Sequence, residues 1–466
     1  MAHSAVSALA VDNLAGSFSG RLVQPGDAGY DEARTVWNGM IDRRPGLILR
    51  CTTPADVSRA VRFARANNLL VAVRGGGHNI AGSAVCEGGL MIDLSPMRAV
   101  LVDPAARTAR VEAGATLADV DRATQAHGLA TPLGINSTTG IAGLTLGGGF
   151  GWLSRRFGLT IDNLLSAEVV TANGEAVHAS ATENPDLFWA IRGGGGNFGV
   201  VTSFEFRLHP VGPEVLSGMI VHPLSAAREV LRFYRDFLPT TPDEFVCWFV
   251  LRKAPPLPFL PPEWHGREIL ALAMCWSGGL AEGERVAAPL RACGKPLADV
   301  IAPHPYTGWQ TVLDPLLTPG LRNYWKSHDF LELSDGLIDV LVKYANQIPD
   351  PNTEIAFAQL GGAVSRVALD ATAYTHRNAQ FVVNVHGRWE DPAKDEQCIA
   401  WARELFRAAE PFATGGVYVN FLTQEEGDRV RAAYGPNYGR LVELKNRYDP
   451  TNLFRTNQNI RPAAKG

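Results

Sequence analysis

The 466-residue sequence predicts an α+β fold built in two parts. Residues 46–212 alternate helices with short strands, whereas long strand candidates separated by amphipathic helices follow Pro213. Three glycine clusters, at 74–78, 140–151 and 192–199, all lie in the first part. The second part has the pattern of an antiparallel sheet with helices over one face.

Composition argues against several classes of protein. The 43 Lys and Arg residues and 47 Asp and Glu residues are interspersed and give a net charge of −4, unlike a nucleic-acid-binding surface. Six scattered cysteines include no CxxC pair, which indicates neither a metal site nor a disulfide framework. We find no signal peptide and no apolar window that could span a membrane. We therefore expect a cytoplasmic protein with no metal, nucleic-acid or membrane partner.

In the first part, the periodicity predicts a helix over 54–68 that leads through a strand at 69–73 into the first glycine cluster. Strands are expected at 88–94 and 108–114, and a helix over 116–128 that ends at Gly128. Residues 199–211 alternate as a strand, with Phe204 and Phe206 on one face and Glu205 and Arg207 on the other.

In the second part, strands are expected at 244–254, 267–278, 353–364 and 379–389, and helices at 226–238 and 398–410. The proline-rich stretch 253–264 is typical of a surface loop. On the strand 379–389, Asn384, His386 and Arg388 share one face, which either lines a cavity or meets solvent. Other polar candidates for a cavity are Trp325, Lys326, His328 and Gln359.

The glycine clusters indicate a bound phosphate-bearing group. Glycine runs let several backbone amides approach one ligand, and three runs in one part favour a single extended cofactor over isolated tight turns. Neither a GxGxxG turn in a dinucleotide-binding context nor a GxxxxGK[ST] loop is present. A histidine, His78, stands at the end of the first cluster.

Four segments resemble a known family: VRGGGHNIAG (73–82), GLTLGGGFGWLSRRFGLTIDNLLSAEVVTANGE (143–175), NPDLFWAIRGGGGNFGVVTSFEFRLHPV (184–211) and YDPTNLFRTNQNIRP (448–462). They are similar to flavin-linked oxidases of the vanillyl-alcohol oxidase fold, in the berberine-bridge-enzyme branch, and especially to bacterial 6-hydroxynicotine oxidases. The resemblance implies an N-terminal segment (1–41), a PCMH-type FAD-binding domain (42–212), a substrate domain (213–425) and a C-terminal segment (426–466) that returns to the FAD domain.

The resemblance also implies FAD bonded covalently through His78. Many relatives carry a second, cysteinyl link, but Asn136 in GINSTTG occupies that position here, so a single histidyl link is expected. The implied cofactor-binding residues are Arg74, Gly75, Gly76, Gly77, His78, Asn79, Ser83, Gly134, Asn136, Thr138, Gly140, Gly143, Gly147, Gly149, Gly199, Val200, Val201, Asn457 and Asn459.

Enzymes of this type move a hydride from a carbon bearing oxygen or nitrogen to flavin N5, and a protein group accepts the accompanying proton. By resemblance Tyr418 is the base or orienting group and Asn420 its partner, although Phe421 replaces a second tyrosine of the family segment. We expect an oxidase of a small alcohol, amine or phenolic heterocycle that uses O2 and releases H2O2, as a monomer or homodimer. By resemblance, Gly134 is small at a position that influences oxygen access in relatives, which favours an oxidase over a dehydrogenase. The alternatives are a dehydrogenase with another acceptor and a drug-binding resistance protein on the same scaffold.

Overall fold

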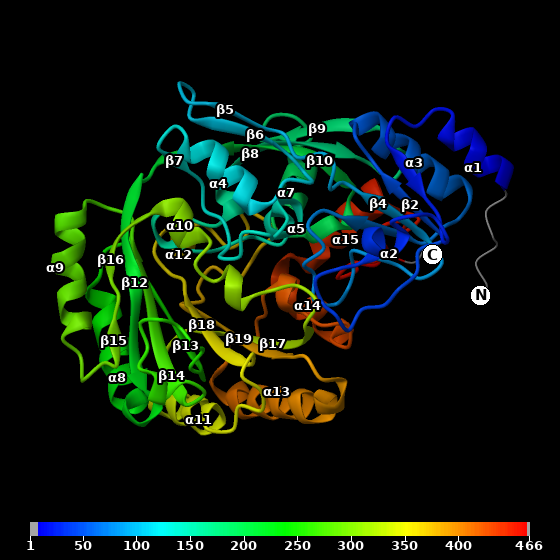
Figure 1. Ribbon diagram of the computed structural model, residues 1–466. Coiled ribbons are helices and arrows are strands. Elements are labelled where there is room, and N and C mark those ends of the chain that lie inside the picture. The colour runs from blue at the N-terminus through cyan, green and yellow to red at the C-terminus, as the bar shows by residue number, and fades with distance from the viewer. Residues whose placement is uncertain (1–7, 464–466) are drawn as a thin grey trace.

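The computed structural model describes residues 8–463, so part of the N-terminal segment expected at 1–41 lies outside the described residues. Two sheets form one half of the molecule, and a third, larger sheet forms the other half beneath them in Figure 1. Helices are packed on the far side of the large sheet. The predicted α+β class is confirmed.

The first sheet carries the first glycine cluster. Its strand order is β1-β2-β4-β3, with β2, β4 and β3 parallel and β1 antiparallel to β2. Helix α3 (Pro54–Ala66) connects β2 to β3, and the Thr53 side chain caps it by accepting from the Asp56 amide at 3.2 Å. The strands are β1 (Arg21–Val23), β2 (Leu47–Arg50), β3 (Val71–Arg74) and β4 (Leu90–Asp93).

The second sheet is antiparallel, in the order β5-β6-β10-β8-β9. On β10, Phe204 and Phe206 are buried whereas Arg207 is exposed, as its alternation predicts. A separate pair, β7 with β11, leads toward the second half. The strands are β5 (Val100–Asp103), β6 (Thr108–Glu112), β7 (Leu129–Ala130), β8 (Leu164–Val170), β9 (Ala176–Ser180), β10 (Val200–Arg207) and β11 (His209–Pro210).

Short helices surround these two sheets and carry the remaining glycine clusters. The second cluster spans α5 and the loop after it, and the third follows α7. The helices are α1 (Ala8–Ala15), α2 (Tyr30–Arg34), α4 (Leu117–Gln125), α5 (Ile141–Leu146), α6 (Ser154–Phe157) and α7 (Pro185–Ile191).

The large sheet is antiparallel, in the order β15-β12-β14-β13-β18-β19-β17, and β16 also pairs with β12. The four predicted strands are β13, β14, β18 and β19, whereas β12 and β17 were not predicted. Strand β17, RNYWKSHDF, is polar yet almost wholly buried, so it lacks the usual apolar alternation. The strands are β12 (Glu214–Pro223), β13 (Phe245–Lys253), β14 (Glu268–Trp276), β15 (Ala298–Asp299), β16 (Ala302–Pro305), β17 (Arg322–Phe330), β18 (Glu354–Gln359) and β19 (Phe381–Trp389).

The two faces of this sheet have different neighbours. Helices cover one face, where Phe381, Val383 and Val385 of β19 join an apolar core. The alternate residues Asn384 and His386 lie on the other face, toward the glycine-rich half. The helices of this half are α8 (Ala227–Phe237), α9 (Leu280–Arg291), α10 (Tyr306–Gln310), α11 (Asp335–Ala345), α12 (Ala363–Arg366) and α13 (Asp395–Ala409).

The C-terminal segment returns to the first half through α14 (Val430–Tyr434) and α15 (Tyr438–Tyr448). The Lys445 ammonium is buried, pairs with Asp449 at 2.8 Å and donates to the Asn197 carbonyl at 2.9 Å. The Asn197 side chain donates to the Gln458 carbonyl at 3.2 Å and accepts from the Ile460 amide at 2.9 Å. These contacts fasten the tail to the third glycine cluster. Across residues 8–463, every helix is too short or too polar to cross a bilayer.

Candidate active site

A cavity of about 350 Å³ lies between the two halves. All three glycine clusters contribute to one side of it, and side chains of the large sheet form the other side. The volume and the mainly apolar lining are typical of a small-molecule site. Sixteen predicted site residues line it: Gly75, Gly76, Gly77, His78, Asn79, Ser83, Gly134, Asn136, Gly140, Gly143, Gly199, Val200, Val201, Asn457, Tyr418 and Asn420.

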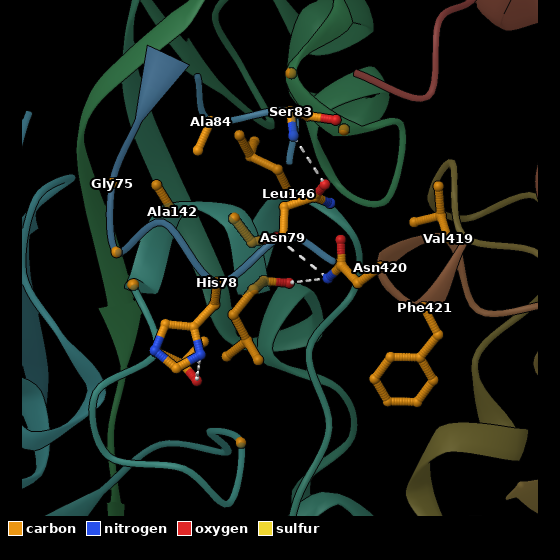
Figure 2. Close-up of a pocket in the computed structure, with 18 of the residues that line it drawn as sticks. Gly75, His78, Asn79, Ser83, Ala84, Ala142, Leu146, Val419, Asn420 and Phe421 are labelled. Atoms are coloured by element: carbon orange, nitrogen blue, oxygen red, sulfur yellow. Dashed lines mark hydrogen bonds between the residues drawn. The ribbon is translucent and has the colours of Figure 1, made fainter. Parts of the chain in front are cut away.

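His78 is held in place by the residues around its ring. Its imidazole stacks on Trp37 with a centroid separation of 5.3 Å, and its Nε2 lies 2.9 Å from the Thr138 hydroxyl. Figure 2 shows this ring at the end of the loop that follows β3, across the cavity from Asn420 and Phe421. Trp37 was not predicted from the sequence, because it lies about 40 residues before His78 and belongs to no recognisable pattern.

The hydrogen bonds also fix the protonation of His78. Thr138 donates its hydroxyl hydrogen to Asn136 Oδ1 at 2.7 Å, so toward His78 it can only accept. Nε2 therefore carries the hydrogen, and Nδ1 keeps a lone pair that faces the Thr139 hydroxyl at 3.4 Å. Burial lowers the pKa of His78 to about 4, so the ring is neutral at pH 7.

Asn136, at the position where relatives place a cysteine, has a structural role in the loop. Its Nδ2 donates to the Leu317 carbonyl at 3.1 Å, across to the second half, and its Oδ1 orients Thr138. The amide thus helps to set the orientation of His78 through one intervening hydroxyl.

The first two glycine clusters touch through their backbones. A Cβ added at Gly76 would lie 2.3 Å from the Gly140 amide nitrogen, and one added at Gly140 would lie 2.2 Å from the Gly76 nitrogen. Only glycine permits this approach, which keeps the His78 loop beside α5.

Some predicted site residues do not line the cavity. The Arg74 guanidinium pairs with Asp93 at 2.8 Å and donates to the Ala33 carbonyl, which makes it a support of the loop. Asn459 lies in a neighbouring hollow lined by arginines of the C-terminal segment. The other three lie just behind the lining and contact residues that form it. Thr138 contacts His78, Gly147 lies against Asn420, and the Gly149 amide donates to Tyr418.

Tyr418 and Asn420 form a hydrogen-bonded pair on a short 3-10 turn rather than on a strand. The Tyr418 hydroxyl accepts from the Gly149 amide and from Asn420 Nδ2, each at 3.0 Å. Asn420 also donates to the Gly143 carbonyl at 3.2 Å, the contact drawn toward α5 in Figure 2. Burial raises the pKa of Tyr418 to about 12, although both donors oppose the shift. The phenol is therefore protonated at neutral pH.

The sheet side of the cavity is mainly aromatic. Phe150 packs edge-on against Tyr418 and Trp248, with centroid separations of 4.9 and 5.9 Å. Trp325 and Phe421 complete an apolar surface on which Asn384 and His386 are the polar members from β19. Of the two environments left open by the sequence for that face, Asn384 and His386 have the cavity, whereas Arg388 lies outside it and donates to the Leu316 and Thr318 carbonyls.

The residues present fit an FAD cofactor. Glycine backbones supply the close approach that a pyrophosphate needs, and His78 supplies a neutral imidazole. Buried side-chain oxygens of Thr456 and Asn457 at the cavity lack a hydrogen-bond partner, so this part of the lining has bonding capacity for a polar ligand. Within residues 8–463 no cluster of three His, Cys, Asp or Glu side chains could hold a metal ion.

Comparisons with known proteins agree with this fit. An FAD binding domain model matches residues 45–180, and a model described as berberine and berberine like matches residues 417–461. The uncharacterised FAD-linked oxidoreductase YgaK of Bacillus subtilis is 34% identical over 95% of this chain and 97% of its own length. The (R)-6-hydroxynicotine oxidase of Paenarthrobacter nicotinovorans is 32% identical over 96% of this chain and 97% of its own length.

Solved structures share the fold along nearly all of the chain. The crystal structure of 6-hydroxy-D-nicotine oxidase from Arthrobacter nicotinovorans superposes with a TM-score of 0.86 at 30% identity, covering 96% of this chain and 98% of that one. The xylooligosaccharide oxidase of Myceliophthora thermophila C1 superposes with a TM-score of 0.86 at 25% identity, covering 98% and 100%. The expected cofactor, FAD, is confirmed, and the chain belongs to the berberine-bridge-enzyme-like family of FAD-linked oxidoreductases.

Proposed function

We propose that the protein is an oxidase that carries FAD bonded through His78 and oxidises a carbon bearing oxygen or nitrogen in a small molecule. The observation that carries this proposal is the His78 imidazole, which is neutral, fixed by Thr138 and Trp37, and located at the cavity. A neutral ring nitrogen that carries a lone pair is the nucleophile that a covalent link requires. With Asn136 in place of a cysteine, one link is proposed.

The cofactor-binding residues proposed from the sequence would contact different parts of FAD. Gly75, Gly76 and Gly77 would hold the pyrophosphate, and Asn457 would bond the flavin. FAD supplies the two-electron acceptor when it is bound. The aromatic side of the cavity would exclude water and favour a neutral or aromatic alcohol or amine. That class agrees with the substrates for which two relatives are named, a hydroxynicotine and a xylooligosaccharide.

Tyr418 and Asn420 would orient the substrate. Both lone pairs of the Tyr418 hydroxyl are engaged by Gly149 and Asn420, which leaves its hydrogen to donate to a substrate oxygen or nitrogen. Because its pKa is raised, Tyr418 acts as a donor at neutral pH rather than as a phenolate base.

Acid precipitation tests the covalent link. We expect yellow colour in the precipitated wild-type protein, a mass increase of one FAD on the peptide that contains His78, and release of the colour from His78→Ala. The control is His127→Ala, which removes an exposed histidine at the end of α4 and should keep the link. Colour released from the wild type would refute it.

Oxygen consumption tests the oxidase assignment. With 6-hydroxynicotine or xylobiose as probes, we expect O2 uptake with matching H2O2 release. A flavin that a probe reduces but that remains reduced in air would instead identify a dehydrogenase.

A further inference from the structure

Four side chains form a row across four adjacent strands of the large sheet. Register pairs Arg252 of β13 with Glu354 of β18, Glu354 with His386 of β19, and His386 with Trp325 of β17. Arg252 Nη1 lies 2.6 Å from Glu354 Oε2, and His386 Nδ1 lies 3.0 Å from Glu354 Oε1. The His386 and Trp325 ring centroids are 4.0 Å apart. Each member therefore touches the next on one face of the sheet.

The carboxylate determines which nitrogen of His386 carries hydrogen. Burial alone would raise the pKa of Glu354, but Arg252 and the hydrogen bond from His386 lower it to about 2, so Glu354 is ionised and only accepts. His386 must donate from Nδ1. Burial lowers the pKa of His386 while Glu354 opposes the shift, so the ring is neutral at pH 7, with its lone pair on Nε2. Arg388, on the same strand, also disfavours the charged ring.

Nε2 of His386 has no protein partner, although the residue is only 7% exposed. A buried acceptor of this kind is costly unless a ligand or water satisfies it. His386 lines the same cavity as His78, and the two rings are connected through Trp37 and Trp325, whose centroids are 5.8 Å apart. His386 therefore belongs to the same site as the proposed flavin attachment.

Tyr418 cannot take this role in the arrangement described. Its hydroxyl already accepts two hydrogen bonds and has a hydrogen left only to donate, whereas His386 offers an acceptor without a partner. The two groups are complementary: one donates to the substrate heteroatom and the other can remove its hydrogen.

Resting on the proposed oxidation, we infer that His386 Nε2 is the catalytic proton acceptor and that Glu354, itself held by Arg252, is its positioning residue. The substrate carbon gives its hydrogen and two electrons to bound FAD, the O–H or N–H bond breaks, and a C=O or C=N bond forms. The released proton goes to Nε2, and Glu354 balances the charge of the resulting imidazolium.

The tautomer of His386 can be tested without turnover. In Glu354→Gln, the amide oxygen must face Arg252, which only donates, so the amide NH2 faces His386 Nδ1. The hydrogen on His386 should then move to Nε2 and abolish the free acceptor. Nitrogen-15 NMR of histidine-labelled holoenzyme, with His386 assigned by its loss in His386→Gln, should show Nδ1–H in the wild type and Nε2–H in Glu354→Gln.

Binding of phenol as an inert probe gives a second readout independent of catalysis. Its hydroxyl should donate to His386 Nε2 in the wild type and shift that resonance, whereas in Glu354→Gln Nε2 carries hydrogen, cannot accept, and should keep its N–H character. The matched control is Glu168→Gln, which alters a partly exposed His–Glu pair with Nδ1 2.9 Å from the carboxylate, at His178 in the other half. Glu168→Gln should leave the His386 resonances unchanged.

Kinetics with 6-hydroxynicotine or xylobiose complete the test. His386→Gln and Glu354→Gln should each lower kcat/KM by about 10² to 10⁴-fold, and the double variant should lose no more than the larger single loss. Wild-type kcat/KM should fall as the pH drops through the pKa of His386, below 6.5, and His386→Gln should lack this fall. Glu168→Gln should stay within about twofold of the wild type, and all variants should keep their FAD content.

Three results would overturn the inference: an Nε2–H tautomer in the wild type, phenol binding that leaves His386 undisturbed, or unchanged kcat/KM in His386→Gln. Failure of the proposed function is separate, because it appears as wild-type enzyme whose flavin no probe reduces. The NMR and phenol measurements then still decide whether His386 is the free acceptor at this cavity.

Discussion

The two sides of the cavity differ in what lines them: backbone atoms on the glycine side and side chains on the sheet side. The glycine side is made of backbone, and its Gly76 and Gly140 approach each other closely because neither has a side chain. The sheet side is made of side chains, and its properties depend on a row of partners such as Arg252, Glu354 and His386 from three strands. The glycine side has no room for a side chain where Gly76 meets Gly140. On the sheet side, by contrast, side chains can be exchanged without moving the backbone.

The largest effect is expected from a single methyl group on the glycine side. In Gly76→Ala the new Cβ would lie 2.3 Å from the Gly140 nitrogen and 2.7 Å from its Cα, so two backbone segments must separate. We expect a loss of more than about 4 kcal/mol in the free energy of unfolding, together with loss of FAD binding. Urea denaturation and FAD content measure both.

The control for this substitution is Gly439→Ala in α15, where an added Cβ meets no atom within 4 Å. Alanine favours a helix by up to about 1 kcal/mol over glycine, so this variant should be as stable as the wild type or more so. Equal stability of the two variants would show that the close approach does not constrain the loop.

A somewhat smaller loss is expected where the tail joins the glycine side. Lys445→Met removes the ammonium that pairs with Asp449 and leaves a fully buried carboxylate without its cation. We expect about 3–5 kcal/mol of destabilisation, measured by urea denaturation. Lys295→Met, at an exposed lysine, should change stability by less than about 0.5 kcal/mol. Similar losses in both would argue against the ion pair as the cause.

The third prediction is a gain in the free energy of unfolding, from a substitution at Asp121 behind the cavity, where the two halves meet. Asp121 of α4 accepts from Gln310 of α10 at 3.0 Å, and burial raises the pKa of Asp121 to about 7. Its pKa in the unfolded chain is about 3.9. The stability associated with its neutral form is therefore present below pH 4 and is lost as the pH rises through 7.

Asp121→Asn keeps the acceptor for Gln310 and stays neutral at every pH. We expect it to exceed the wild type by about 2–4 kcal/mol at pH 8 and to match it at pH 4, as measured by denaturation at both values. Asp370→Asn, at an exposed position, should show little difference at either pH. A constant gap between pH 4 and pH 8 would exclude titration of Asp121 as the cause.

The glycine side could be predicted because its determinants are contiguous in the sequence. The His78 loop, the Asn136 segment and the tail at 448–462 are short motifs, and the structure brings nearly all of their predicted residues to one cavity. Arg74 is the instructive exception. A motif specifies that an arginine is needed, but only the fold shows that it supports the loop through Asp93.

The sheet side could be predicted only in part. Alternation placed Asn384 and His386 on one face of a strand but could not identify what that face meets. Glu354 and Arg252 come from strands 32 and 102 residues away from their respective partners, and their pairing depends on register that no local pattern encodes. Strand β17, which supplies Trp325, lacks apolar alternation because some of its buried polar side chains bond to other elements, such as His328 to the Phe406 carbonyl and Lys326 to Glu425.

The tail contact at Asn197 has a consequence for biosynthesis. Asn197 is synthesised long before its partners Gln458 and Ile460, which follow it by 261 and 263 residues. A nascent chain thus holds its glycine loops while their final wall is still missing. We therefore expect a chain that stops before Gln458 to lack this wall of the cavity and to bind FAD less well.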